Sequence, residues 1–126
     1  MTPMTEQEIF DRVARHLLTQ GREAQDHNKI NGAYVCRYKT ADGLMCAIGC
    51  LIPPENYSEA MEGKRVMHNE VYSRLPKLAE EVRANLLVSL QAIHDGSFPI
   101  VWKRELEGLG KRLELDTKVL EEFPDA

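Results

Sequence analysis

The sequence predicts an α+β fold: one mostly helical domain over residues 1–126, with four to five helices and one small antiparallel β-hairpin. Three observations lead to this expectation. Apolar residues recur at three- and four-residue spacing in several segments, which is the period of an amphipathic helix. One segment alternates in the manner of a strand. A chain of 126 residues without a repeat or linker is close to the commonest size of a single domain.

The first helix is expected to begin at about residue 6. Thr5 and Glu8 have the spacing of a capping box, in which each side chain satisfies a backbone N–H group of the first helical turn. Gly21 is the expected end, because glycine adopts the left-handed conformation that terminates helices. We assign to the core the apolar stripe between these signals, which consists of Ile9, Phe10, Val13, Leu17 and Leu18.

The hairpin is expected after a loop of about ten residues. Side chains alternate over residues 33–39, and residues 40–43 are the predicted turn. A short return strand over residues 44–45 should give way to a short helix that starts near Cys46 and ends before Pro53. Two strands alone are marginally stable in water, so this hairpin must pack against helices.

The second half of the chain is expected to be helical. Pro76 can open a central helix that ends at Gly96, and Ser97 can cap a further helix with Pro99 in its first turn. A short helix is expected near Val71, and the last six residues are expected to fray. The predicted buried residues of the two longer helices are Leu78, Val82, Leu86, Leu90, Ile93, Val101 or Trp102, Leu106, Leu109 and Leu113.

Charge and composition exclude several classes of protein. The chain has 20 acidic and 16 basic residues, a net charge of −4, which argues against binding to duplex nucleic acid. No apolar run approaches the roughly 20 residues of a membrane span, and the first residues lack the pattern of a signal peptide. We therefore expect a cytosolic protein with no membrane partner; assembly into a homo-oligomer is left open. The three cysteines are interpreted as thiols.

Basic and aromatic residues gather on and near the predicted hairpin. Arginine offers a planar fork for phosphate or carboxylate groups, and tyrosine offers a stacking face. The residues predicted to bind a small anion are Tyr34, Arg37, Tyr38, Lys39, Cys46 and Tyr57, with Lys64 and Arg65 further along the chain. In this interpretation the short helix at Cys46 directs its N-terminus at the anion. The alternative is that Arg37 and Lys39 form the solvated face of the hairpin.

The runner-up function is a cysteine-dependent hydrolase or transferase. Cys46 would be the nucleophile, His94 the base and Asp95 the group that orients the base. The adjacency of His94 and Asp95 counts against this site, because neighbouring side chains on a helix do not normally face each other. Cys46 and Cys50 are otherwise small buried residues.

No metal site or cofactor is predicted. Cys36, Cys46 and Cys50, with His68 or His94, could supply four zinc ligands. Their spacings of nine and three intervening residues match no common zinc motif, and no C-x-x-C pair is present.

Several short strings resemble a group of small, functionally unassigned proteins that bacteria and their tailed phages encode. The resemblance covers about residues 6 to 113 and implies a biological context but no catalytic role. Phage genomes carry small proteins that sequester the nucleotide signals of host immunity. The strings that carry the resemblance are Cys36-Arg37-Tyr38, Gly43, Cys46-Ala47-Ile48-Gly49, Leu51-Ile52-Pro53, Tyr57, Glu62-Gly63, Gln91, His94-Asp95 and Trp102.

The sequence thus leads to a non-enzymatic binding protein for a small anionic ligand, such as a nucleotide signal sequestered by a phage anti-defence protein. Two other classes stay open. One is the enzyme based on Cys46, and the other is a helical module that inhibits a host protein through its amphipathic helices.

Overall fold

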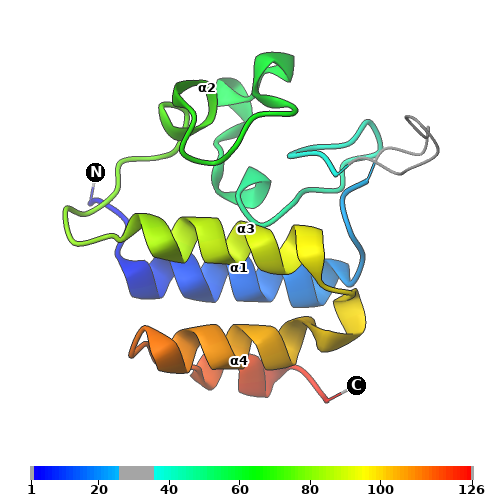
Figure 1. Cartoon of the computed structure of the whole chain (residues 1–126), viewed down its shortest axis with the longest axis vertical. Helices are drawn as coiled ribbons and strands as arrows, with labels where there is room; N and C mark the ends of the chain where they lie inside the picture. The colour runs from blue at the N-terminus through cyan, green and yellow to red at the C-terminus, as the bar shows by residue number, and fades with distance from the viewer. Residues whose placement is uncertain (1, 26–35, 126) are drawn as a thin grey trace.

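Three long helices organise the protein. The structure is a computed structural model that describes residues 2–25 and 36–125. Helices α1 (Glu6–Gln20), α3 (Ala84–Gly96) and α4 (Trp102–Arg112) pack against one another and lie side by side in Figure 1. The described part of the segment between α1 and α3 lies over one side of these helices and contains the short helix α2 (Asn69–Tyr72) and three 3-10 turns.

The prediction for α1 is confirmed. The Thr5 hydroxyl accepts a hydrogen bond from the Glu8 N–H, and Glu8 Oε1 accepts one from the Thr5 N–H at 3.0 Å. Gly21 ends the helix with φ 67°, and its N–H donates to the Leu17 carbonyl oxygen at 2.8 Å. Of the predicted core stripe, Ile9, Phe10, Val13 and Leu17 are fully buried, together with Ala14, whereas Leu18 is only partly buried.

Helix α3 begins at Ala84 and not at Pro76. The backbone of Met4 lies parallel to this stretch, since its N–H donates to the Lys77 carbonyl at 3.0 Å and its carbonyl accepts from the Ala79 N–H at 2.9 Å. These peptide groups are therefore held in extended backbone by a segment more than 70 residues away.

The C-terminal part differs from expectation at both of its ends. Ser97 does not cap α4 with its side chain; a 3-10 turn over Pro99–Val101 leads into that helix instead. Beyond α4, the 3-10 turn Lys118–Glu122 buries two apolar side chains, and Lys103 Nζ donates to the Phe123 carbonyl at 2.7 Å. The tail up to residue 125 therefore contacts α1 and α4, which differs from the frayed end that the sequence predicts. The buried residues of this region are Trp102, Leu106, Leu109, Leu113, Val119 and Leu120.

The predicted antiparallel hairpin is wrong, because no β-strand forms in residues 2–25 or 36–125. The chain does reverse near residues 40–44, but only one bridge, between Lys39 and Met45, joins its two arms. The N–H groups of Tyr38 and Lys39 donate to the Glu62 carboxylate at 2.9 and 3.2 Å. The Met45 N–H donates to Gln20 Oε1 at 3.0 Å. Side chains from distant segments thus satisfy the backbone groups that a strand ladder would use. The fold is accordingly helical, with four α-helices in the described residues.

The short helix expected at Cys46 is a single 3-10 turn over Gly49–Leu51. Glycine is required at its first position. A Cβ atom on Gly49 would overlap the Tyr38 carbonyl oxygen and lie 2.9 Å from the Tyr38 carbonyl carbon. The two arms of the 36–51 segment therefore cross in direct backbone contact, which is possible only without a side chain at position 49.

The buried apolar residues from all these elements form one hydrophobic cluster. Trp102 and Phe10 are the largest fully buried side chains. Within the described residues, no helix combines the length and the apolar character needed to cross a membrane.

Candidate functional site

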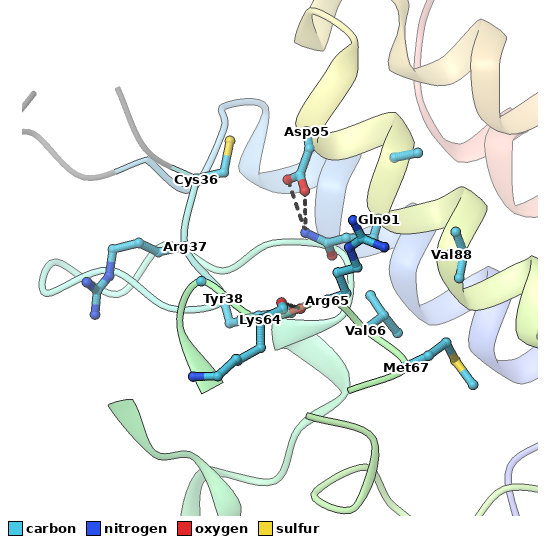
Figure 2. A pocket seen from close by; sticks show the side chains of 12 residues that line it. Cys36, Arg37, Tyr38, Lys64, Arg65, Val66, Met67, Val88, Gln91 and Asp95 are labelled. Atoms are coloured by element: carbon cyan, nitrogen blue, oxygen red, sulfur yellow. Dashed lines mark hydrogen bonds between the residues drawn. The ribbon is translucent and has the colours of Figure 1, made fainter. Parts of the chain in front are cut away.

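A pocket of about 610 Å³ lies between the 36–38 segment, the loop of residues 63–67 and one face of α3 (Figure 2). Apolar side chains form much of its wall, and three basic and one acidic side chain reach it. Its lining residues are Cys36, Arg37, Tyr38, Gly63, Lys64, Arg65, Val66, Met67, Val88, Gln91, Ala92 and Asp95.

Gln91 fixes the α3 side of the pocket. Its Oε1 accepts a hydrogen bond from the Ile48 N–H at 3.1 Å, which leaves Nε2 as the donor group. Nε2 donates to Asp95 Oδ1 at 3.0 Å and to Asp95 Oδ2 at 3.1 Å (Figure 2). The Gln91 side chain therefore connects the backbone at Ile48, just before the 3-10 turn Gly49–Leu51, to the carboxylate of Asp95.

His94 and Asp95 do face each other, although they are neighbours on one helix. His94 Nδ1 lies 2.7 Å from Asp95 Oδ1, and Nε2 accepts a hydrogen bond from the Ala24 N–H at 2.9 Å. A nitrogen that accepts from a backbone N–H carries no proton, so the neutral ring has its proton on Nδ1 and donates it to Asp95. His94 is fully buried and stacks on Trp102 with ring centroids 5.6 Å apart. Both ring nitrogens are thus in use, and neither is available as a base.

Cys36, not Cys46, is the cysteine next to this pair. Its Sγ, an oxygen of Asp95 and a ring nitrogen of His94 all lie within 4.8 Å of one another. Burial and the neighbouring Asp95 charge raise the pKa of the Cys36 thiol to about 11, so the thiol is neutral at pH 7. A metal ion at this cluster would have to displace the Nδ1 proton of His94 while the Ala24 N–H occupies Nε2. The donor set therefore does not fit a metal.

Cys46 has no exposed surface, and its Sγ accepts a hydrogen bond from the Gly49 N–H at 3.2 Å. Burial raises the pKa of this thiol well above its ordinary value. A substrate cannot reach the sulfur in this structure. Cys46 does not line the pocket, and the turn that follows it is too short to provide a helical N-terminus for an anion.

Arg37 lines the pocket, but its charge is already compensated. Its Nη2 donates to both carboxylate oxygens of Glu59, at 2.7 and 2.8 Å, and lies 3.8 Å from Glu62 Oε2. Its Nε donates to the Lys39 carbonyl at 3.2 Å. The predicted anion-binding arginine is therefore part of an ion-pair network on the protein itself.

The predicted stacking residues also have structural partners. Tyr38 is 6% exposed, and its hydroxyl donates to the Lys64 carbonyl at 2.6 Å. The Tyr57 hydroxyl donates to Glu62 Oε2 at 2.6 Å, and Lys39 Nζ lies 5.5 Å from the centre of the Tyr57 ring. Tyr57 and Lys39 do not line the pocket. Tyr34 falls outside the described residues.

The exposed cations of the site are Lys64 and Arg65, which follow the positive-φ residue Gly63. Lys64 Nζ donates to the Ala60 carbonyl at 3.3 Å, and the Arg65 guanidinium group has no hydrogen-bond or ion-pair partner in residues 2–25 and 36–125. Figure 2 shows the Arg65 side chain extending from its loop toward α3. The sequence identifies the pair Lys64 and Arg65, but only the structure shows that the pair lies opposite α3.

The pocket thus offers an apolar wall, two exposed cations and one carboxylate, with no ionised thiol. Such a surface suits the binding of a small molecule with an anionic group. No family model, curated protein or solved structure matches this chain.

Proposed function

We propose that this protein binds a small anionic ligand in the pocket between α3 and the 63–67 loop, and that the ligand is a nucleotide or a molecule of similar size. One observation carries the proposal. On a protein with a net charge of −4, a lysine and an arginine with no ion-pair partner among the described residues lie at a pocket of about 610 Å³. A local group of uncompensated cations on an acidic surface selects an anionic ligand without attracting polyanions over the whole protein.

The size and the apolar wall of the pocket support a ligand with an apolar body. Small-molecule sites commonly enclose about 300–1,000 Å³ and combine apolar walls with a few polar groups. Val66, Met67 and Val88 supply such a wall, and Met67 and Val88 are 44% and 46% exposed. The planar guanidinium group of Arg65 can form two parallel hydrogen bonds with a phosphate or carboxylate.

The state of the cysteines supports binding over catalysis. Cys36 is the thiol that lines the pocket, and its raised pKa of about 11 keeps it protonated at neutral pH. His94 cannot activate it, because the ring already donates from Nδ1 and accepts at Nε2. The resemblance to bacterial and phage proteins supplies the setting we propose, in which the protein sequesters a nucleotide signal in the host cytosol.

Isothermal titration of mononucleotides and inorganic phosphate tests the proposal. The Arg65→Ala variant should bind a phosphate-containing ligand about 10- to 150-fold more weakly than the wild type, as expected for loss of hydrogen bonds between charged groups. Arg112 on α4 is exposed and does not line the pocket, so Arg112→Ala is the matched control and should bind as the wild type does. The proposal is wrong if Arg65→Ala and Arg112→Ala bind equally well, or if the wild type binds no anion of this panel.

A further inference from the structure

The carboxylate of Asp95 has one acceptor position open toward the pocket. Among the described residues, Oδ1 accepts from both His94 Nδ1 and Gln91 Nε2, whereas Oδ2 accepts the longer bond from the same Gln91 amide, at 3.1 Å, and the Cys36 thiol, a weak donor, also lies against the carboxylate. Each carboxylate oxygen can accept about two hydrogen bonds. The side chain is 43% exposed and lines the pocket, so this position is open to a ligand.

The surroundings of Asp95 allow an N–H donor and disfavour an oxygen acceptor there. In residues 2–25 and 36–125, the groups recorded against it are the Gln91 amide, the neutral His94 ring and the protonated Cys36 thiol, and none of these carries a positive charge to neutralise it. A ligand oxygen placed against the carboxylate would meet a negative charge with no shared proton, which costs free energy. A ligand amino group would supply the missing donor.

The basic and acidic groups come from different walls of the pocket. Lys64 and Arg65 lie on the 63–67 loop, whereas Asp95 lies near the C-terminal end of α3 (Figure 2). The apolar side chains of Val66 and Val88 lie on the same two walls. A ligand that contacts both charged groups must carry an anionic group and a hydrogen-bond donor, and an apolar body can lie against Val66 and Val88.

We infer that the pocket selects nucleotides whose base carries an exocyclic amino group, with Asp95 Oδ2 accepting from that group and Arg65 and Lys64 holding the phosphate. This inference rests on the proposed function. Cytosine and adenine present an amino donor at the position where uracil, thymine and hypoxanthine present a carbonyl oxygen, and carboxylates are known acceptors of the cytosine amino group. A single open acceptor position fits one such donor.

Matched nucleotide pairs test the inference on the unmodified protein. Cytidine monophosphate should bind about tenfold or more tightly than uridine monophosphate, and adenosine monophosphate should exceed inosine monophosphate by a similar factor. N4,N4-dimethylcytidine monophosphate keeps the ring but has no N–H on its amino nitrogen, so it should bind no better than uridine monophosphate. In the Asp95→Asn variant, the preference for cytidine over uridine monophosphate should fall to about threefold or less, because the amide can donate to a carbonyl.

The outcomes separate this inference from the proposed function. If nucleotides bind in an Arg65-dependent way but cytidine and uridine monophosphates bind equally, the inference is wrong and the anion site stands. If the dimethylated nucleotide binds as tightly as cytidine monophosphate, Asp95 does not recognise the amino N–H group and the inference is wrong. Absence of binding by all nucleotides and by inorganic phosphate would overturn both. The nucleotide affinities of the wild-type protein test the inference even if Asp95→Asn fails to fold.

Discussion

Replacing Glu62 by glutamine should destabilise the fold strongly, although the two side chains have nearly the same size. The Glu62 side chain is 11% exposed and accepts hydrogen bonds from the Tyr38 N–H, the Lys39 N–H and the Tyr57 hydroxyl, while Arg37 lies 3.8 Å away. Glutamine has one oxygen, so its NH₂ group must face a donor on one side. Hydrogen bonds to charged groups contribute about 1.5–3 kcal/mol each, so we expect the free energy of unfolding to fall by about 2–4 kcal/mol.

Urea denaturation followed by circular dichroism measures this change, and the melting temperature should fall by about 10 °C. The control is Glu59→Gln. Glu59 also binds Arg37, but it is 73% exposed, so its loss should cost no more than about 1 kcal/mol. If the two variants lose the same amount of stability, then Glu62 does not organise the 36–46 segment, and our explanation for the missing hairpin is refuted.

Two further predictions concern glycine packing and the thiols. Gly49→Ala should lower the free energy of unfolding by about 3 kcal/mol or more, because its Cβ would overlap the Tyr38 carbonyl. Gly96→Ala should be nearly neutral, because a Cβ at that position meets no atom within 4 Å; chemical denaturation of both variants checks this. In the folded protein, alkylation of Cys36 by iodoacetamide should keep accelerating up to pH about 11, and Cys46 should stay unlabelled; mass spectrometry would contradict this if Cys46 reacted first. Since these folded-state thiol pKa values are raised, the unfolded thiols ionise first, and the free energy of unfolding should fall as pH rises above about 9.

Local signals in the sequence were sufficient for the parts of the fold that depend on neighbouring residues. The capping box at Thr5, the end at Gly21 and the buried stripe of α4 all follow from contacts within about one helical turn. The start of α3 does not, because Met4 competes for the peptide groups of residues 77–79. The alternating pattern of residues 33–39 predicts a strand, because the residues near it in sequence do not indicate that Glu62 accepts the N–H groups of Tyr38 and Lys39.

In the candidate site, too, the sequence predicts individual residues but not the contacts between distant segments. Arg37, Tyr38 and Asp95 were identified from residue type and do line the pocket. Residue type did not reveal that Glu59 neutralises Arg37, since this ion pair joins segments 22 residues apart. Val66 and Val88 have no chemical signature in the sequence; they become part of a site only where the 63–67 loop packs against α3.

The side-chain partners of the 36–48 backbone also determine when this segment can form during folding. Gln20 lies on α1, Gln91 on α3 and Glu62 beyond both arms of the turn, so the segment gains its hydrogen bonds only after these distant parts have assembled. Contacts of such long sequence separation form late and are lost together. The amide protons of Met45 and Ile48 should therefore exchange with solvent through cooperative opening of the helical core and not through local fraying of a surface turn.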